Sequence, residues 1–451
     1  MLLSFTIENW MSYRDEATLS MVGSLERQHM NTLAKLPGFR SKKALPVAAV
    51  YGGNASGKTC LFQALACLRH MVVTDPGVSG PVPVIPFLLE DGFTSKLTVF
   101  DITFLAGKTV YRYVVEATVD GIRYESLERV GQSGSKDVFE REAGSDGKAD
   151  SYGFEKAFFS ESDHVEYAAK STRGNRLFLG SAVAQNVIEL QEAYDWFAIT
   201  LELVGVESQA WSFATCATEQ EGFMAYAADV LSRLDTGIVD LATEEVSIDA
   251  LPQNAEFRKA IAELGPNATL ACVSERGFGD YGFELVTVRK EGEQAVAERL
   301  RTVHMGPDGK RRSFSLSQES SGTRRLMGLL PMLFDLVNAD GSSAAKVYVV
   351  DELDRCLHTM LTKRLIQDFL AGCNADTRKQ LMFTTHDLLL MDQSLMRRDE
   401  MYISQRGTDG CSELVGLVEF DGIRFDKDLI RSYLDGRFGG IPMLGEAGAR
   451  G

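Results

Sequence analysis

Residues 52–59, Gly-Gly-Asn-Ala-Ser-Gly-Lys-Thr, match the phosphate-loop pattern G-x-x-x-x-G-K-[ST]. The motif follows a short apolar run at 45–51 and leads into a segment with helical spacing, which is the context that the pattern requires. The glycines let the backbone curl so that its N–H groups face a phosphate. A lysine there neutralises β- and γ-phosphate charge, and a threonine hydroxyl binds Mg²⁺. The predicted nucleotide-binding residues are Gly52, Asn54, Gly57, Lys58 and Thr59.

An acidic pair ends the apolar run at 346–350. In phosphate-loop proteins a buried parallel strand delivers such an acid to the phosphate site, where it holds Mg²⁺. We assign that role to Asp351, and Glu352 is the candidate general base that activates the attacking water. Taken alone, the pair could be an ordinary strand end whose two acids reach solvent. The phosphate loop upstream favours the functional interpretation.

His386 ends a second segment of the same kind, residues 380–387, in which an apolar strand is followed by polar residues. Ligands in such sheets bind at the carboxyl ends of the strands. His386 is therefore placed to sense the γ-phosphate and to connect it with the attacking water. A lone histidine is more often structural, but its position at this edge favours a functional role.

The stretch 315–330, Ser-Leu-Ser-Gln-Glu-Ser-Ser-Gly-Thr and then an apolar helix, is a helix start rich in serine and glycine. Such an end presents free N–H groups to an anion. Ser320 and the Gly322 backbone suit a γ-phosphate, yet the loop at 52–59 already holds the nucleotide of its own chain. The sequence thus predicts that this turn serves the nucleotide of a second copy, in a head-to-tail pair around a two-fold axis. The alternative is a plain N-capped helix.

The elements around these motifs indicate an α/β core assembled from both ends of the chain. Residues 1–22 alternate like a strand pair, and 96–145 resemble an antiparallel meander. Helical spacing dominates 184–203, 221–234 and 252–265, and strands return at 268–305. Strands and helices then alternate to the end, as in a mostly parallel sheet. We predict two core halves, 1–180 and 266–451, and a helical lobe inserted at 181–265.

Composition excludes several classes of protein. The chain has 451 residues with a net charge of −16, which argues against binding nucleic acid over its whole surface. Seven scattered cysteines without a C-x-x-C indicate reduced thiols and a cytoplasmic location. No signal peptide and no apolar run long enough for a membrane helix is visible.

These motifs together resemble the bacterial ABC-type ATPases of the RloA and AbiLi abortive-infection group, relatives of the OLD-family and SMC-like ATPases. The resemblance rests on the N-terminal strand pair, "GGNASGKT", the meander, "ESSGTRRL", "VYVVDELDRCLH", "FTTHD" and "YLDGRFGGIPML". It implies an ABC-type phosphate-loop ATPase head that hydrolyses ATP with Mg²⁺ in a homodimer or higher even-numbered oligomer. It also implies a role in phage defence or a toxin–antitoxin system, with a separately encoded effector nuclease or toxin.

Some positions depart from the family pattern. The signature Leu-Ser-Gly-Gly is Glu319-Ser320-Ser321-Gly322 here. The aspartate of the transporter D-loop falls at His358, as in the abortive-infection group, and no Q-loop glutamine is evident in 82–92. The metal contact and the coupling element that such a glutamine provides stay unassigned.

Other functions fit the residues less well. About 60 residues follow His386, which we expect to be too few for the Toprim nuclease of OLD-type relatives. No other nuclease motif is evident in the sequence. The acids at 426–429 resemble a helix start. A DNA-maintenance ATPase of the SMC type is the main alternative, although 181–265 is too short for coiled-coil arms. Basic residues at 310–312 could contact DNA, but they first suggest a solvated hairpin tip. A GTPase or kinase lacks its guanine motif, and a transporter lacks its membrane domain.

Overall fold

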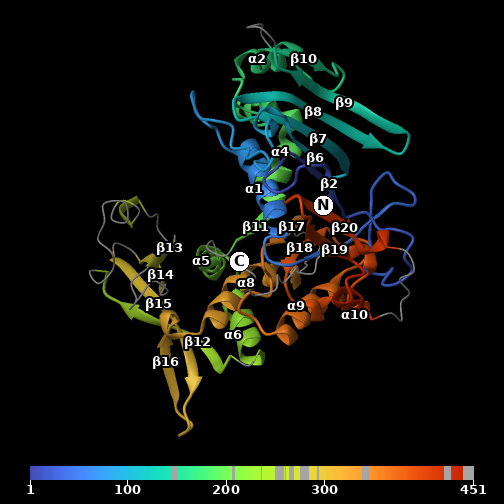
Figure 1. The fold of residues 1–451 in the computed structure, drawn as a ribbon. Helices are drawn as coiled ribbons and strands as arrows, with labels where there is room; N and C mark the ends of the chain where they lie inside the picture. The colour runs from blue at the N-terminus through green and yellow to red at the C-terminus, as the bar shows by residue number, and fades with distance from the viewer. Residues whose placement is uncertain are drawn as a thin grey trace, which may run out of the picture. The chain divides into compact units, whose positions relative to one another are not determined.

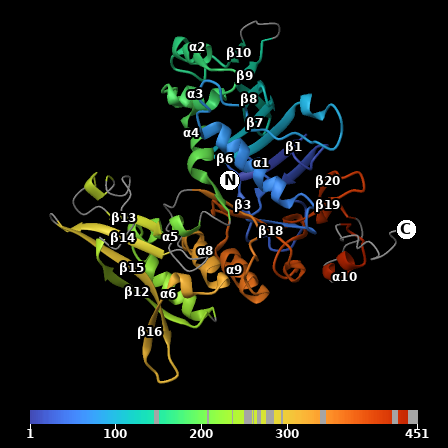
Figure 2. The same cartoon turned by 60° about the vertical axis from the view of Figure 1, so that its left-hand side comes forward.

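The computed structural model divides into two compact units. The first comprises Met1–Leu203, Ser343–Leu353 and Leu370–Gly451, and the second comprises Val204–Ser342 and Asp354–Phe369. Figures 1 and 2 show the elements of both. The structure describes residues 1–144, 150–205, 209–234, 236–248, 259, 261–263, 269–274, 284–291, 294–337, 345–420 and 428–439.

An antiparallel sheet of seven strands dominates the N-terminal half of the first unit (Figure 1). The predicted meander at 96–145 forms four of its strands, and the strand pair predicted at 1–22 forms its other end. Along β6 and β7, buried side chains largely alternate with partly buried ones, as in an antiparallel sheet that packs one face on the core. In spatial order the strands are β10 (Ser151–Phe154), β9 (Gly134–Glu142), β8 (Gly121–Gly131), β7 (Thr109–Thr118), β6 (Thr98–Ala106), β1 (Leu2–Glu8) and β2 (Ala17–Ser20).

A second, mostly parallel sheet forms the α/β core and confirms the predicted fold class. Its β5 and β18 are buried along their whole length, which is typical of a strand covered on both faces. β17 pairs with β18, and β18 and β19 pair with β5, all in parallel. In order the strands are β11 (Leu201–Val204), β17 (Lys346–Val350), β18 (Lys379–Thr385), β5 (Val47–Tyr51), β19 (Met401–Arg406) and β20 (Ser412–Gly416).

Helices and short turns complete the first unit. The segment predicted as one helix at 184–203 is instead a 3₁₀ turn, α4, a π-helical turn at Trp196–Thr200 and then β11. Its aromatic rings hold it on the seven-stranded sheet, with Trp196 stacked on Phe104 at 4.5 Å between centroids. The remaining elements are α1 (Lys58–Val73), α2 (Ser162–Ser171), α3 (Phe178–Ala184), α4 (Gln191–Asp195), α10 (Leu429–Leu434), and the strand pair β3 (Ala34–Lys35) and β4 (Lys43–Ala44).

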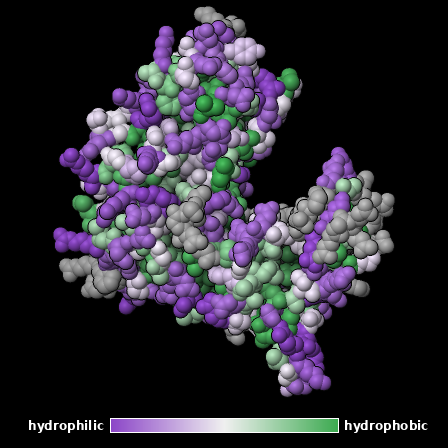
Figure 3. All heavy atoms as spheres, turned by 180° about the vertical axis from the view of Figure 1, so that it is seen from behind, coloured by the Kyte–Doolittle hydropathy of each residue, from purple (hydrophilic) through white to green (hydrophobic). Residues whose placement is uncertain are grey.

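The second unit combines helices with a small antiparallel sheet. The strands are β12 (Ile238–Val246), β15 (Gln294–Met305), β14 (Glu284–Glu291) and β13 (Thr269–Ser274), with β16 (Arg311–Ser315) paired to β15. The helices are α5 (Gln209–Glu219), α6 (Phe223–Arg233), α8 (Ser321–Val337) and α9 (Thr359–Gly372), the last ending in the first unit. Figure 3 shows hydrophilic side chains over the projecting end of the β15–β16 hairpin.

The prediction of a purely helical insert at 181–265 is wrong in two respects. Residues up to 203 belong to the first unit, and β12 is a strand. β12 is rich in β-branched residues and pairs with β15 along its length, a distant partner that local periodicity does not reveal. The helix predicted at 252–265 lies largely outside the described residues, as do residues 426–427 and 440–444 of the C-terminal motifs.

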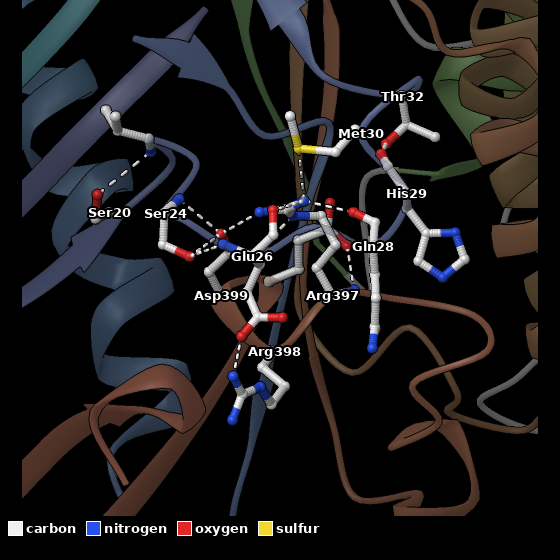
Figure 4. Close-up of polar contacts among 12 residues, drawn as sticks. Ser20, Ser24, Glu26, Gln28, His29, Met30, Thr32, Arg397, Arg398 and Asp399 are labelled. Atoms are coloured by element: carbon white, nitrogen blue, oxygen red, sulfur yellow. Dashed lines mark hydrogen bonds and ion pairs between the residues drawn. The ribbon is translucent and has the colours of Figure 1, made fainter. Parts of the chain in front are cut away.

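A buried polar cluster fastens the N-terminal loop at 24–30 to the segment before β19 (Figure 4). The Arg397 side chain is fully buried and donates to both carboxylate oxygens of Asp399, at 2.8 and 2.7 Å. It also donates to the carbonyl oxygens of Glu26 and Gln28. Burial alone would raise the pKa of Asp399, but hydrogen bonds from Arg397 and Ser24 lower it overall.

Glu400 belongs to the same cluster, but the pKa of its carboxyl group shifts in the opposite direction to that of Asp399. One carboxylate oxygen accepts from the Arg397 backbone N–H at 2.7 Å, while the other accepts no hydrogen bond within the described part of the chain. Burial, with the Asp399 charge nearby, raises the pKa of Glu400 to about 8. Glu400 is therefore mostly protonated at neutral pH in the folded protein.

Glu400→Gln should flatten the pH dependence of stability. The folded-state pKa of Glu400 lies above the ordinary value of 4.5. The contribution of Glu400 to the free energy of unfolding is therefore full below pH 4.5 and is lost as the pH rises through 8. Its slope is about 1 kcal/mol per pH unit over that window. Chemical denaturation of wild type and variant at several pH values measures the difference. Equal slopes for the two proteins would contradict a protonated Glu400.

Candidate active site

The phosphate loop connects β5 to α1, as the motif predicts. Gly57 has φ +113°, and a Cβ there would lie 2.7 Å from the Ser412 hydroxyl oxygen. A Cβ on Gly52 would overlap the carbonyl oxygen of Ser404. Both positions require glycine because β19 and β20 approach the loop closely. The neighbouring strands thus fix the curl of the loop.

Lys58, the first residue of α1, lies with its side chain inside the loop. Its ammonium donates to the carbonyl oxygens of Gly52 and Gly53, at 2.9 and 2.8 Å, and lies 3.5 Å from His386 Nδ1. The residue is 5% exposed. This cationic, N–H-lined loop fits a polyphosphate. Asn54, the other predicted binding residue, is exposed on the loop.

The acidic pair follows β17 at the same sheet edge, because β17, β18 and β5 run parallel. Asp351 Oδ1 lies 3.5 Å from the Thr59 hydroxyl oxygen. A hydroxyl and a carboxylate beside a phosphate loop fit Mg²⁺, which keeps several waters and needs few protein ligands. Among the described residues, no group of three or more His, Cys, Asp or Glu side chains that could hold a metal ion is found.

Glu352 and His386 lie together at this edge. His386 Nε2 is 3.7 Å from Glu352 Oε1, and both side chains are about one-third exposed. The two ring nitrogens of His386 thus face Lys58 on one side and Glu352 on the other. The structure thus places Lys58 beside His386, His386 beside Glu352, and Thr59 beside Asp351.

Thr384 is a site residue that the sequence reasoning missed. Its buried hydroxyl donates to Asp351 Oδ1 at 2.6 Å and accepts from the Glu352 backbone N–H at 2.7 Å. Glu352 has φ +51°, a backbone conformation that costs free energy for a non-glycine residue. Thr384 therefore holds both acids in place. The only signal in the sequence is its position two residues before His386.

The serine-rich turn lies in the second unit, at the start of α8. Ser320 Oγ accepts from the Thr323 backbone N–H at 3.1 Å, so Ser320 caps the helix. A Cβ on Gly322 would lie 2.5 Å from the carbonyl oxygen of Cys356. The helix start is where the sequence placed it, and Ser320 itself is exposed.

The basic residues at 310–312 lie at the end of the β15–β16 hairpin. Arg311 pairs with Asp240, and Arg312 pairs with Asp308 at 2.9 Å. Two of the three cations thus have acidic partners. These pairs favour the interpretation of this tip as solvated surface over that of a DNA contact.

Comparison with known protein families places the chain in one of them. A family model described as "AAA domain, putative AbiEii toxin, Type IV TA system" matches residues 47–171 and 228–392, more than half of the chain. The matched ranges contain the phosphate loop, the serine-rich turn, the acidic pair and His386. Comparison with curated proteins gives no significant match.

Two solved structures are similar to the chain. The SMC head domain from Thermotoga maritima is 12% identical, with 92% of this chain and 98% of that chain covered and a TM-score of 0.37. The SMC head bound to the C-winged helix domain of ScpA is 11% identical, with 92% and 97% covered and a TM-score of 0.40. Among the described residues, none of the helices combines the length and the apolar character that crossing a membrane requires.

Thr384→Val should lower nucleotide turnover by about 10–100-fold, the usual cost of losing a group that orients a metal-holding residue. Nucleotide affinity should change little, because Lys58 and the loop are untouched. Thr384→Ser keeps the hydroxyl and is the matched control. Turnover and nucleotide binding are measured for both variants. Full activity in the valine variant would show that the hydroxyl does not position the acids.

Proposed function

Because the chain belongs to the family described as "AAA domain, putative AbiEii toxin, Type IV TA system", we propose that it is a Mg²⁺-dependent ATPase of an anti-phage defence system. The observation that carries the ATPase part is the meeting of Lys58, Asp351, Glu352 and His386 at one sheet edge. Their types and order match phosphate binding, metal binding, water activation and γ-phosphate sensing. No nuclease role is proposed for this chain.

Each residue has a defined task in this proposal. The loop N–H groups and Lys58 bind the β- and γ-phosphates, and Thr59 and Asp351 hold Mg²⁺. When bound, Mg²⁺ neutralises charge on the phosphate oxygens. Glu352 accepts the proton of the attacking water, and His386 orients that water toward the γ-phosphate. His386 is suited to this task because its ring spans from the Lys58 ammonium to the Glu352 carboxylate.

We propose that two copies complete each site. The start of α8 presents Ser320 and the Gly322 backbone as anion donors. One phosphate loop per chain already binds that chain's nucleotide, so the turn is free to face the nucleotide of the second copy. A head-to-tail pair with two-fold symmetry then holds two ATP molecules between its subunits.

The biological role that we propose is that of an ATP-gated sensor or scaffold controlling a separate effector, a nuclease or a toxin. It rests on the family description and on the resemblance to the RloA and AbiLi abortive-infection group. A cytoplasmic location is part of the proposal, since none of the six cysteines with described side chains forms a disulfide. Direct action on DNA by an SMC-like ATPase is the second candidate, and the paired arginines at 311–312 argue against that hairpin as its contact.

Mixing two inactive variants tests the composite site. Lys58→Ala removes phosphate binding, while Gly322→Asp displaces the turn from Cys356 and adds a negative charge facing phosphate. Each variant alone should lose most ATPase activity. A mixture should recover part of the ATPase activity, because a mixed dimer retains one site in which both the phosphate loop and the serine-rich turn are unaltered. Steady-state ATP hydrolysis at several mixing ratios is the measurement, and no recovery at any ratio would exclude a turn that acts across subunits.

Glu352→Gln tests the defence role. The variant should bind ATP but hydrolyse it about 10²–10⁴-fold more slowly, which traps the closed state. Tagged protein expressed with its native genomic neighbours should then co-purify a nuclease-like or toxin-like protein in stoichiometric amount with ATP. Mass spectrometry identifies the partner, and Lys58→Ala, which cannot close on ATP, is the control. Recovery of DNA without a protein partner would favour the SMC-like alternative.

A further inference from the structure

Glu319 stands where the signature pattern has leucine, directly before Ser320. An exposed acid there would repel phosphate and oppose the proposed function of the turn. The structure shows otherwise, because the Glu319 side chain is only 6% exposed. The carboxylate therefore points into the second unit.

The buried carboxylate has two partners on β15. Glu319 Oε1 accepts a short hydrogen bond from the Thr302 hydroxyl and lies 2.8 Å from His304 Nε2. Thr302 and His304 are two residues apart on one strand, so their side chains share a face of the sheet. The His304 ring packs edge-on against Phe314 of β16, with centroids 4.9 Å apart. The histidine that meets Glu319 is thus itself held by the hairpin.

The chain on the other side of Glu319 is also fixed. Strand β16 runs into a 3₁₀ turn at Leu316–Gln318, which a capping box closes between Ser315 and Gln318. Ser320 then caps α8 through the Thr323 N–H. Between these two caps Glu319 makes the side-chain contacts to β15. It is the link that sets where the Ser320 hydroxyl and the Gly322 N–H stand relative to the sheet.

We infer that Glu319 is a positioning residue that locks the signature turn onto β15 through Thr302 and His304. The inference rests on the proposed function, in which that turn completes the ATP site of a second copy. A buried carboxylate is stable only when it is hydrogen-bonded, so it fixes a direction that an apolar side chain would leave open. The departure from the leucine of the signature pattern thus has a physical reason.

The test uses Glu319→Leu, which introduces the leucine of the Leu-Ser-Gly-Gly signature and removes the hydrogen bonds to β15. ATP turnover should fall by about tenfold or more, while ATP binding to the variant's own phosphate loop should stay as in wild type. Glu245→Leu is the matched control, since Glu245 is an exposed acid on β12 of the same sheet. Thr302→Val removes one donor at nearly constant volume and should show a smaller loss of the same kind.

Mixing experiments distinguish positioning from a general loss of structure. Glu319→Leu subunits should regain activity with Lys58→Ala subunits, whose signature turn is intact. They should gain none with Gly322→Asp or with Ser320→Arg, a second lesion of the turn at an exposed side chain. A protein damaged as a whole would be rescued by neither.

Three results would overturn the inference: wild-type turnover in Glu319→Leu, rescue by the signature variants, or rescue by neither class. Failure of the proposed function would be seen in a different mixing experiment. In that case Lys58→Ala and Gly322→Asp would not rescue each other, whatever Glu319→Leu does. The two ideas therefore fail in separate experiments.

Discussion

Parallel pairing of β17, β18 and β5 is the constraint on which the candidate site depends. Their registers place Val350 beside Phe383 and Thr385 beside Tyr51. The three strands therefore end at the same edge of the sheet, and the segments that follow them begin close together. Lys58 Nζ lies 3.5 Å from Nδ1 of His386, 328 positions later, and the Thr59 hydroxyl lies 3.5 Å from Oδ1 of Asp351, 292 positions later. An antiparallel neighbour in this position would have sent one of them to the opposite edge.

A buried amide helps to join this core sheet to the seven-stranded sheet. Gln380 of β18 is fully buried, accepts from the Leu2 backbone N–H at 2.6 Å and donates to the carbonyl oxygens of Leu2 and Leu45. The Gln380 side chain thus provides hydrogen-bond partners for the backbone groups of Leu2 and Leu45 where the two sheets meet. The N-terminal strand and the strand before His386 are thus fastened to each other.

The local motifs were predictable, and the contacts that position them were not. The phosphate loop, Asp351 and His386 follow from short patterns whose chemistry is fixed by residue type. Thr384 was missed because its partners lie more than 30 residues away and only the β17–β18 register brings them together. β12 was assigned to a helical lobe because its partner β15 lies about 60 residues later. The contacts of Glu319 likewise depend on a hairpin register that local periodicity does not encode.

The fastening of Leu2 to Gln380 has a consequence for how the chain is made. The two residues are 378 positions apart, so the hydrogen bond between β1 and Gln380 cannot form until those intervening residues have been synthesised. At about 5–20 residues per second, that interval is roughly 20–75 s. Throughout it, β5 also lacks both of its neighbours in the core sheet. The nascent chain therefore carries the apolar strand β5 on the ribosome without its partners β18 and β19, and molecular chaperones would have their longest access to it before the candidate site is complete.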